Sequence, residues 1–287
     1  MELIRQIDLS QIIRAALAED VGQGDVTTAA TVAPDSRGRA RITVKEPGET
    51  VFCGGFMFEK IFAMTSGEPK IVSLSDEGAT LEHGAIAAAI EGRLAGLLIG
   101  ERAALNFVQL MSGVATTTRR YVAAVASSRA RIIDTRKTHP GLRALEKYAV
   151  RCGGGTNHRF GLDSGVLIKE NHIAAAGGIA SALERVRAHA PHTFRIQIEC
   201  ETLQQVEEAL AARATSILLD NMTLEQMREA RRIAGETVIL EASGGVTLDS
   251  VGDIARTGVD LISVGALTHS VKAVDLSMRI EIIQKGY

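Results

Sequence analysis

The sequence predicts an α/β protein made of an open, incomplete β/α barrel and a smaller N-terminal α+β sheet domain. From Arg131 onward, six short apolar runs alternate with segments of helical periodicity, a pattern typical of a parallel sheet with right-handed crossovers. Six strands fall short of the eight of a closed barrel, so we expect the barrel to be open. From Arg39 to Ala89, short alternating segments punctuated by Gly and Pro predict a small separate sheet.

The N-terminal region is expected to begin with an amphipathic helix capped by Ser10, followed by a loop over residues 20–28. Four segments then predict strands, RARITV, VFCGGF, KIVSL and GAIAAAI, with one helix near residues 56–64. Residues 97–125 are rich in Ala, Leu, Thr and Arg and contain no Pro. They predict a long helical connection with an interruption at Gly113.

The barrel region contains the six strand-like runs RIID, VLIK, RIQIEC, SILLD, VILEAS and LISVG. Two of the segments between them, TLQQVEEALAAR and TLEQMREARRIA, have the apolar spacing of helices. We therefore assign the catalytic barrel to residues 113–269 and the N-terminal α/β sandwich domain to residues 1–112.

The composition predicts a soluble protein of a reducing compartment. The formal net charge of −2 and the 3% of aromatic residues, with no Trp, argue against binding to nucleic acid or an anionic membrane. The three cysteines are far apart and in no metal-ligand spacing, so neither a disulfide framework nor a structural zinc site is expected. The N-terminus has no apolar leader, and charges interrupt the most apolar stretch, residues 94–110. We expect a cytoplasmic protein that does not span a membrane.

Polar and charged residues follow each of the six predicted strands. Because the carboxyl ends of barrel strands meet on one face, these residues are expected to form the active site. Basic and histidine side chains cluster after the first two strands: Arg136, Lys137, His158, Arg159 and Lys169. In a chain of negative net charge, such a set predicts a small ligand with several negative charges.

Acidic and glycine-rich segments follow the later strands. Glu199 and Asp220 are expected to accept hydrogen bonds from sugar hydroxyls or to hold Mg²⁺. Glycines after the last two strands predict a phosphate site, since they let backbone N–H groups approach an anion. The residues of this predicted site are Ser243, Gly244, Gly245 and Gly265. His269 lies shortly after them and is either a ligand of the same site or a loop histidine.

Four stretches closely resemble the quinolinate phosphoribosyltransferase family: GERAALNFVQLMSGVAT, DTRKTHPGLRALEKYAVRCGGGTNHRFGL, VLIKENHI and VDLISVGALTHSVKAVDLSMR. The similarity extends from about Ala15 to Met278. It implies that quinolinate and 5-phosphoribosyl-1-pyrophosphate become nicotinate mononucleotide, pyrophosphate and carbon dioxide, with Mg²⁺ and no organic cofactor, in NAD biosynthesis. It also implies an N-terminal domain rejoined by C-terminal helices over residues 270–287, and a homodimer or higher homo-oligomer.

The resemblance assigns roles to the matching positions. The residues that would surround the carboxylates of the acceptor are Arg102, Arg136, His158, Arg159 and Lys169, with Arg102 supplied by the neighbouring subunit. Lys137 would meet pyrophosphate, Glu199 and Asp220 the ribose hydroxyls and the metal, and Ser243 to Gly245 with Gly265 the 5′-phosphate. We expect catalysis to depend on Lys137, Lys169, Glu199 and Asp220, and we include His269 among the substrate-binding residues.

Two other functions remain open from the sequence. A paralogous group associated with molybdenum transport shares many of these motifs and would use another acceptor, although the full cationic set favours quinolinate. A non-enzymatic anion-binding protein is the second alternative. Glu199 and Asp220 argue against it, because acids would weaken simple anion capture. Gln197 departs from the family, in which an acidic residue is common at this position, and this affects only fine substrate affinity.

Overall fold

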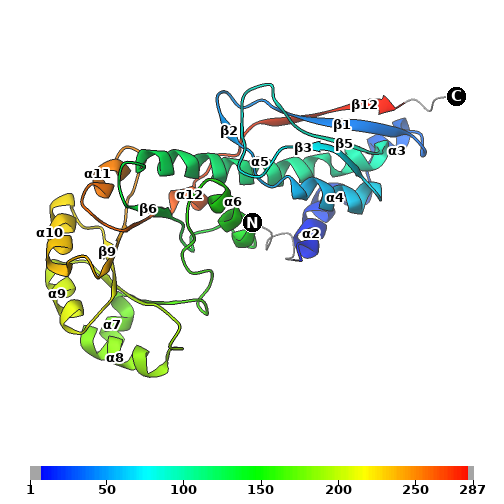
Figure 1. Cartoon of the computed structure of the whole chain (residues 1–287). Coiled ribbons are helices and arrows are strands. Elements are labelled where there is room, and N and C mark those ends of the chain that lie inside the picture. Colours follow the sequence, from blue (N-terminus) through cyan, green and yellow to red (C-terminus); the bar gives the residue numbers. More distant parts are fainter. Residues whose placement is uncertain (1–7, 284–287) are drawn as a thin grey trace. The chain divides into compact units, whose positions relative to one another are not determined.

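The structure, a computed structural model, describes residues 8–283, which form two compact units (Figure 1). The first unit comprises the residues up to Thr117, Pro140–Gly154 and the segment from Val271 onward. The second comprises Thr118–His139 and Gly155–Ser270. An α/β fold with a separate parallel sheet in the C-terminal half confirms the predicted fold class.

The first unit is an antiparallel sheet with helices. Its four-stranded sheet has the order β12-β1-β5-β3, and β2 pairs with β4 in a separate two-stranded sheet. Phe52, Phe58 and Phe62 are among its fully buried side chains. The elements are α2 (Ser10–Val21), α3 (Val26–Thr31), β1 (Arg37–Val44), β2 (Thr50–Val51), α4 (Phe56–Ser66), β3 (Lys70–Leu74), β4 (Thr80–Leu81), β5 (Ile86–Arg93), α6 (Arg143–Cys152), β12 (Leu276–Ile283) and the larger part of α5 (Leu94–Ala124), which continues into the second unit at Thr118.

The C-terminal segment is a strand, so the expectation of helices over residues 270–287 is wrong for its described part. β12 pairs antiparallel with β1 from Leu276↔Val44 to Ile283↔Arg37 (Figure 1, red beside blue). The physical reason is the period of two in LSMRIEII, in which Leu, Met and Ile alternate with Ser, Arg and Glu. Alternation of this kind places the apolar side chains on one face of a strand. Of the predicted region, residues 284–287 lie outside the described residues.

The position of residues 140–154 also departs from the predicted domain boundary at residue 112. They were assigned to the barrel, whereas the structure groups them with the first unit. The reason is the packing of α6, whose Leu145, Tyr148 and Ala149 are buried. The Tyr148 ring meets Phe56 of α4 edge to face, with centroids 5.6 Å apart.

Helix α5 confirms the long helical connection but continues through Gly113 without an interruption. This glycine is required for close packing, because a Cβ built there would lie 2.3 Å from the carbonyl oxygen of Lys272. Over 31 residues, α5 is long and apolar enough to cross a membrane by length and composition, with a mean hydropathy of 1.2 in its most apolar window. More than half of that window is buried inside the protein, as in the core helix of a folded domain.

The N-terminal helices begin at other residues than predicted. The N-cap of α2 is Leu9, and the Asp8 side chain accepts the N–H of Ser10 at 2.8 Å. Helix α3 begins inside the predicted loop, at Val26, because Asp25 caps it by accepting the N–H of Thr28. In VFCGGF, strand pairing stops at Val51.

The second unit contains the six predicted strands in one parallel sheet of order β6-β11-β10-β9-β8-β7. Their apolar runs are buried, as in a sheet covered on both faces. Ile133 of β6 and Val166 of β7, the two edge strands, line one cavity of about 320 Å³, so the sheet is curled into an open barrel. The elements are β6 (Arg131–Ile133), β7 (Val166–Ile168), α7 (Glu170–Ala176), α8 (Ile179–His189), β8 (Ile196–Cys200), α9 (Leu203–Ala211), β9 (Ser216–Asp220), α10 (Leu224–Ala234), β10 (Ile239–Ser243), α11 (Val251–Ala255), β11 (Leu261–Ser263) and α12 (Ala266–His269).

Capping residues fix the direction in which the chain leaves β8 and β9. Thr202 forms a capping box with Gln205 at the start of α9, and Thr223 forms one with Gln226 at the start of α10. Each box satisfies N–H groups of the first helical turn. The carboxyl ends of both strands therefore lead through short turns into helices, as parallel β/α units require.

Candidate functional site

The strand ends of the second unit are aligned at one edge of the sheet. Ser243, at the end of β10, pairs in register with Asp220, at the end of β9. Glu199 on β8 lies level with Leu218 on β9. The sheet therefore brings together the acidic and glycine-rich segments that were predicted to share a site.

Two arginines of this unit lie close enough to repel each other. Burial, followed by the positive charge of Arg136, holds the pKa of the Arg159 guanidinium below its usual value. Arg159 donates through Nη1 to the carbonyl oxygen of Gly165 at 3.0 Å, which fixes the direction of its side chain. Two neighbouring guanidinium groups form a site that an anion with two carboxylates would stabilise.

Asp134 holds the segment that carries Arg159. Its side chain is fully buried, and it accepts the N–H of His158 at 2.8 Å and the side-chain amide of Asn157 at 2.6 Å. Asp134 is the last residue of the predicted strand RIID, and neither it nor Asn157 was given a role in the site from the sequence. A buried carboxylate needs such donors, because burying an unpaired charge is costly.

His158 of this segment forms a group with two buried side chains, Gln197 and Glu241, which were given no role in the site from the sequence. The Nε2 atom of His158 lies 3.2 Å from Oε1 of Gln197, and the Gln197 amide donates to Glu241 Oε2 at 2.8 Å. Gln197 and Glu241 are buried. The available signal was the period of two in β8, which places Gln197 on the same sheet face as Glu199.

Lys169 and Glu199 form an ion pair, with Nζ 3.0 Å from Oε2. The lysine side chain is half exposed and that of the glutamate is 11% exposed, so the pair lies at the surface of the site. One strand further along the sheet, the Asp220 carboxylate accepts the side-chain amide of Asn221 at 2.8 Å. Glu199 and Asp220, the predicted metal ligands, therefore each lie next to a hydrogen-bond donor.

The glycines of the predicted phosphate site differ in backbone conformation, since Gly265 has a φ of −66°. Gly244 and Gly245 both have positive φ, of 98° and 56°, which favours glycine. Gly265 lies beside Lys137 and His269, since a Cβ built on it would be 3.3 Å from Lys137 Cδ and 3.0 Å from the His269 ring. The structure thus brings Lys137, Gly265 and His269 together.

Arg102 belongs to the first unit, where it is exposed on α5. It lines a surface hollow with Glu19, Asp20 and Asn106. The other predicted site residues belong to the second unit. That Arg102 serves the site of a neighbouring subunit stays a prediction.

The three cysteines are free thiols and are buried. Cys53, Cys152 and Glu77 of the first unit form a group whose potential ligand atoms lie within 4.8 Å of one another. Glu77 already accepts the N–H groups of Gly54 and Gly55, each at 2.8 Å. Burial raises the pKa of the Cys53 thiol, and the hydrogen bond from Cys53 lowers that of Cys152.

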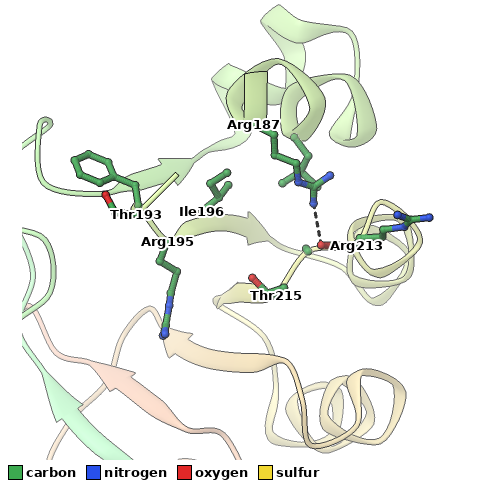
Figure 2. A pocket seen from close by; sticks show the side chains of 9 residues that line it. Arg187, Thr193, Arg195, Ile196, Arg213 and Thr215 are labelled. Carbon is green, nitrogen blue, oxygen red and sulfur yellow. Dashed lines mark hydrogen bonds between the residues drawn. The ribbon is translucent and has the colours of Figure 1, made fainter. Parts of the chain in front are cut away.

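A separate pocket opens at the amino ends of the strands (Figure 2). Thr215 and Ile196, which lie at the start of β9 and β8, line it together with Arg187, Arg195 and Arg213. Arg187 donates to the carbonyl oxygens of Ala212 and Arg213, at 2.8 Å each. Barrel enzymes have their active sites at the opposite, carboxyl ends of the strands, so this pocket is not the predicted site.

The fold and the site define a class of protein: an α/β-barrel protein with arginines, lysines and carboxylates at the carboxyl ends of its strands. Comparison with known proteins identifies the family. The model of the quinolinate phosphoribosyl transferase C-terminal domain matches residues 114–279, and that of the N-terminal domain matches residues 25–112. The chain belongs to the quinolinate phosphoribosyl transferase family, which confirms the resemblance found in the sequence.

Relatives are similar over nearly their whole length. The probable nicotinate-nucleotide pyrophosphorylase [carboxylating] of Bacillus subtilis is 40% identical over 97% of this chain and 96% of its own. Its counterpart in Synechocystis is 44% identical over 92% of this chain and 90% of its own. The solved nicotinate-nucleotide pyrophosphorylase from Ehrlichia chaffeensis has a TM-score of 0.90 at 39% identity, covering 96% of this chain and 99% of its own.

Proposed function

We propose that this chain transfers the phosphoribosyl group of 5-phosphoribosyl-1-pyrophosphate to quinolinate, with decarboxylation, giving nicotinate mononucleotide, pyrophosphate and carbon dioxide. Family membership and the names of the relatives support this reaction. We also propose that the reaction takes place in the cytoplasm.

The observation that carries the proposal is the repulsion between Arg136 and Arg159. Burial, and after it the positive charge of Arg136, lowers the pKa of the Arg159 guanidinium. A dianionic acceptor such as quinolinate would remove that repulsion and accept several charge-assisted hydrogen bonds. The pair of neighbouring cations therefore supports an acceptor that carries two carboxylates.

The chain's side chains have distinct proposed tasks in the transfer. Lys137, beside Gly265, would hold the departing pyrophosphate, and the backbone N–H groups of the Gly244–Gly245 segment would bind the 5′-phosphate. As the C1′–O bond breaks, the pyridine nitrogen attacks C1′. As the adjacent carboxylate departs as carbon dioxide, its electron pair stays on C2, where the quaternised nitrogen stabilises it, and a proton from water then forms the C2–H bond. This chemistry needs positioning and preorganised charge rather than a covalent nucleophile.

Magnesium fits the residues proposed to hold it. Glu199 and Asp220 supply carboxylate oxygens from neighbouring strands, and Mg²⁺ binds such hard oxygen ligands together with waters and phosphates. When bound, Mg²⁺ would neutralise charge on the pyrophosphate. Lys169 forms its ion pair with Glu199 and would hold that carboxylate in place.

We further propose a homodimer in which Arg102 completes the site of the neighbouring subunit. Its exposed position on α5, in the unit that does not contain the other site residues, supports this assignment. A cation reaching in from a partner would add to the attraction for the carboxylates of the acceptor.

The test is release of carbon dioxide from quinolinate labelled at its 2-carboxylate, with phosphoribosyl pyrophosphate and Mg²⁺ added or omitted. We expect release only with all components, and nicotinate should not serve as acceptor. Arg136→Ala should lose at least about 100-fold in kcat/KM for quinolinate, since it removes a charged donor. Arg228→Ala, which changes an exposed arginine on α10, is the matched control. Release without phosphoribosyl pyrophosphate would refute the proposed reaction.

A further inference from the structure

The hydrogen bonds around His158 determine which of its ring nitrogens carries the proton. Nδ1 of the ring accepts the backbone N–H of Arg159 at 2.7 Å, so Nδ1 has no proton. Nε2 therefore carries the hydrogen and donates it to Oε1 of Gln197 at 3.2 Å. His158 is the neutral tautomer protonated at Nε2.

The orientation of the Gln197 amide is fixed from its other side. Glu241 is acceptor-only when ionised, and its Oε2 lies 2.8 Å from the Gln197 amide nitrogen. Reversing the amide would place its oxygen against the Glu241 carboxylate and its NH₂ group against the Nε2–H of His158. Both contacts would be repulsive, so Glu241 selects one amide orientation and, through it, one tautomer.

The hydrogen bonds of this group satisfy only one of the two carboxylate oxygens of Glu241. Its side chain is 2% exposed, and its buried Oε1 has no hydrogen-bond partner among the described residues. A buried carboxylate with one unsatisfied oxygen costs free energy. Its Oε2 accepts the Gln197 amide and lies 3.7 Å from Nε2 of His158, so its contribution is the orientation of Gln197 and a proton on Nε2.

We propose that Gln197 and Glu241 are positioning residues that hold His158 as a neutral acceptor for the Arg159 backbone, and thereby fix Arg159 for the acceptor carboxylates. The backbone N–H of Arg159 is held by His158, and its guanidinium is held by the carbonyl oxygen of Gly165 at 3.0 Å. This inference rests on the proposed function for the identity of the ligand. The tautomer itself is independent of that function.

The first test is ¹⁵N NMR of the protein with labelled histidine rings, in which a His158→Ala variant assigns the resonances among the seven histidines. At pH 7 the His158 ring should show a protonated Nε2 and an unprotonated Nδ1. Gln197→Met, which keeps the volume but removes both hydrogen bonds, should give a mixture of tautomers. A wild-type ring protonated at Nδ1, or at both nitrogens, would overturn the inference.

The second test separates positioning from general stability. Gln197→Met and Glu241→Leu should each raise KM for quinolinate about tenfold, the cost of one unsatisfied buried hydrogen bond. For both variants, kcat and KM for phosphoribosyl pyrophosphate should change by less than about threefold, because Arg159 alone is misplaced. Glu241→Gln keeps an acceptor oxygen and should restore most of the loss seen with Glu241→Leu.

Gln204→Met on the exposed face of α9 is the matched control, because it makes the same change where no buried partner depends on it. Circular dichroism verifies that each variant is folded. An unchanged KM for quinolinate in folded Gln197→Met would refute the positioning role. Failure of the wild-type protein to bind quinolinate would contradict the proposed function instead, while the ring resonances would still test the tautomer.

Discussion

Replacing Gly244 by alanine tests the backbone of the proposed phosphate-binding segment. A Cβ built there would lie 2.0 Å from Oδ1 of Asn221 and 3.0 Å from its backbone nitrogen, and the residue has a φ of 98°. The backbone strain costs about 1–3 kcal/mol. Asn221 would also have to move, which breaks its 3.0 Å hydrogen bond to the carbonyl oxygen of Ser243 at a cost of about 1 kcal/mol. We therefore expect a loss of roughly 2–4 kcal/mol in the free energy of unfolding.

Urea denaturation followed by circular dichroism measures this loss, and the KM for phosphoribosyl pyrophosphate should rise in parallel. Gly245→Ala is the matched control, because its φ is 56° and nothing lies within 4 Å of the new Cβ. It should cost only the left-handed backbone strain, about 1–2 kcal/mol. Equal destabilisation by the two alanine variants would refute the reasoning from the Asn221 contact.

Three further outcomes are expected. Gly265→Val should weaken binding of phosphoribosyl pyrophosphate more than binding of quinolinate, measured by calorimetry, because the new side chain would press on Lys137 and His269; equal losses would contradict the phosphate assignment. Lys169→Ala and Arg102→Ala should each be nearly inactive yet folded, and refolding them together should restore about a quarter of maximal activity if the dimer has closed two-fold symmetry; mixed dimers without turnover would show that Arg102 does not serve its neighbour. A thiol reagent at pH 8 should label neither Cys53 nor Cys200 in the native protein, since burial raises the pKa of both thiols, that of Cys200 to about 12, and it should label both after unfolding.

The parts of this fold that could be predicted are those with a local signal. Six buried strands followed by charged residues or glycines could be recognised because each run is apolar and short, and because helical spacing lies between them. The grouping of Lys137, Gly265 and His269 also followed from the rule that barrel strands converge at their carboxyl ends.

The parts that could not be predicted depend on contacts between distant residues. The group of His158, Gln197 and Glu241 joins one loop and two non-adjacent strands, and no spacing in the sequence indicates that these three side chains meet. The alternation in residues 276–283 indicates a strand, but we expected helices there because the family resemblance implied them. The assignment of residues 140–154 to the first unit depends on aromatic packing by Tyr148, which has no local signature.

The pairing of β12 with β1 has a consequence for synthesis on the ribosome. Strand β1 begins at Arg37, whereas its partner along eight residue pairs ends at Ile283. During translation, the whole parallel sheet emerges before that partner exists, so one edge of β1 stays unpaired while the second unit can already fold. An unpaired edge strand invites pairing with other chains. Nascent or prematurely terminated chains that lack the last strand would therefore be the species of this protein most prone to associate, and most dependent on chaperones.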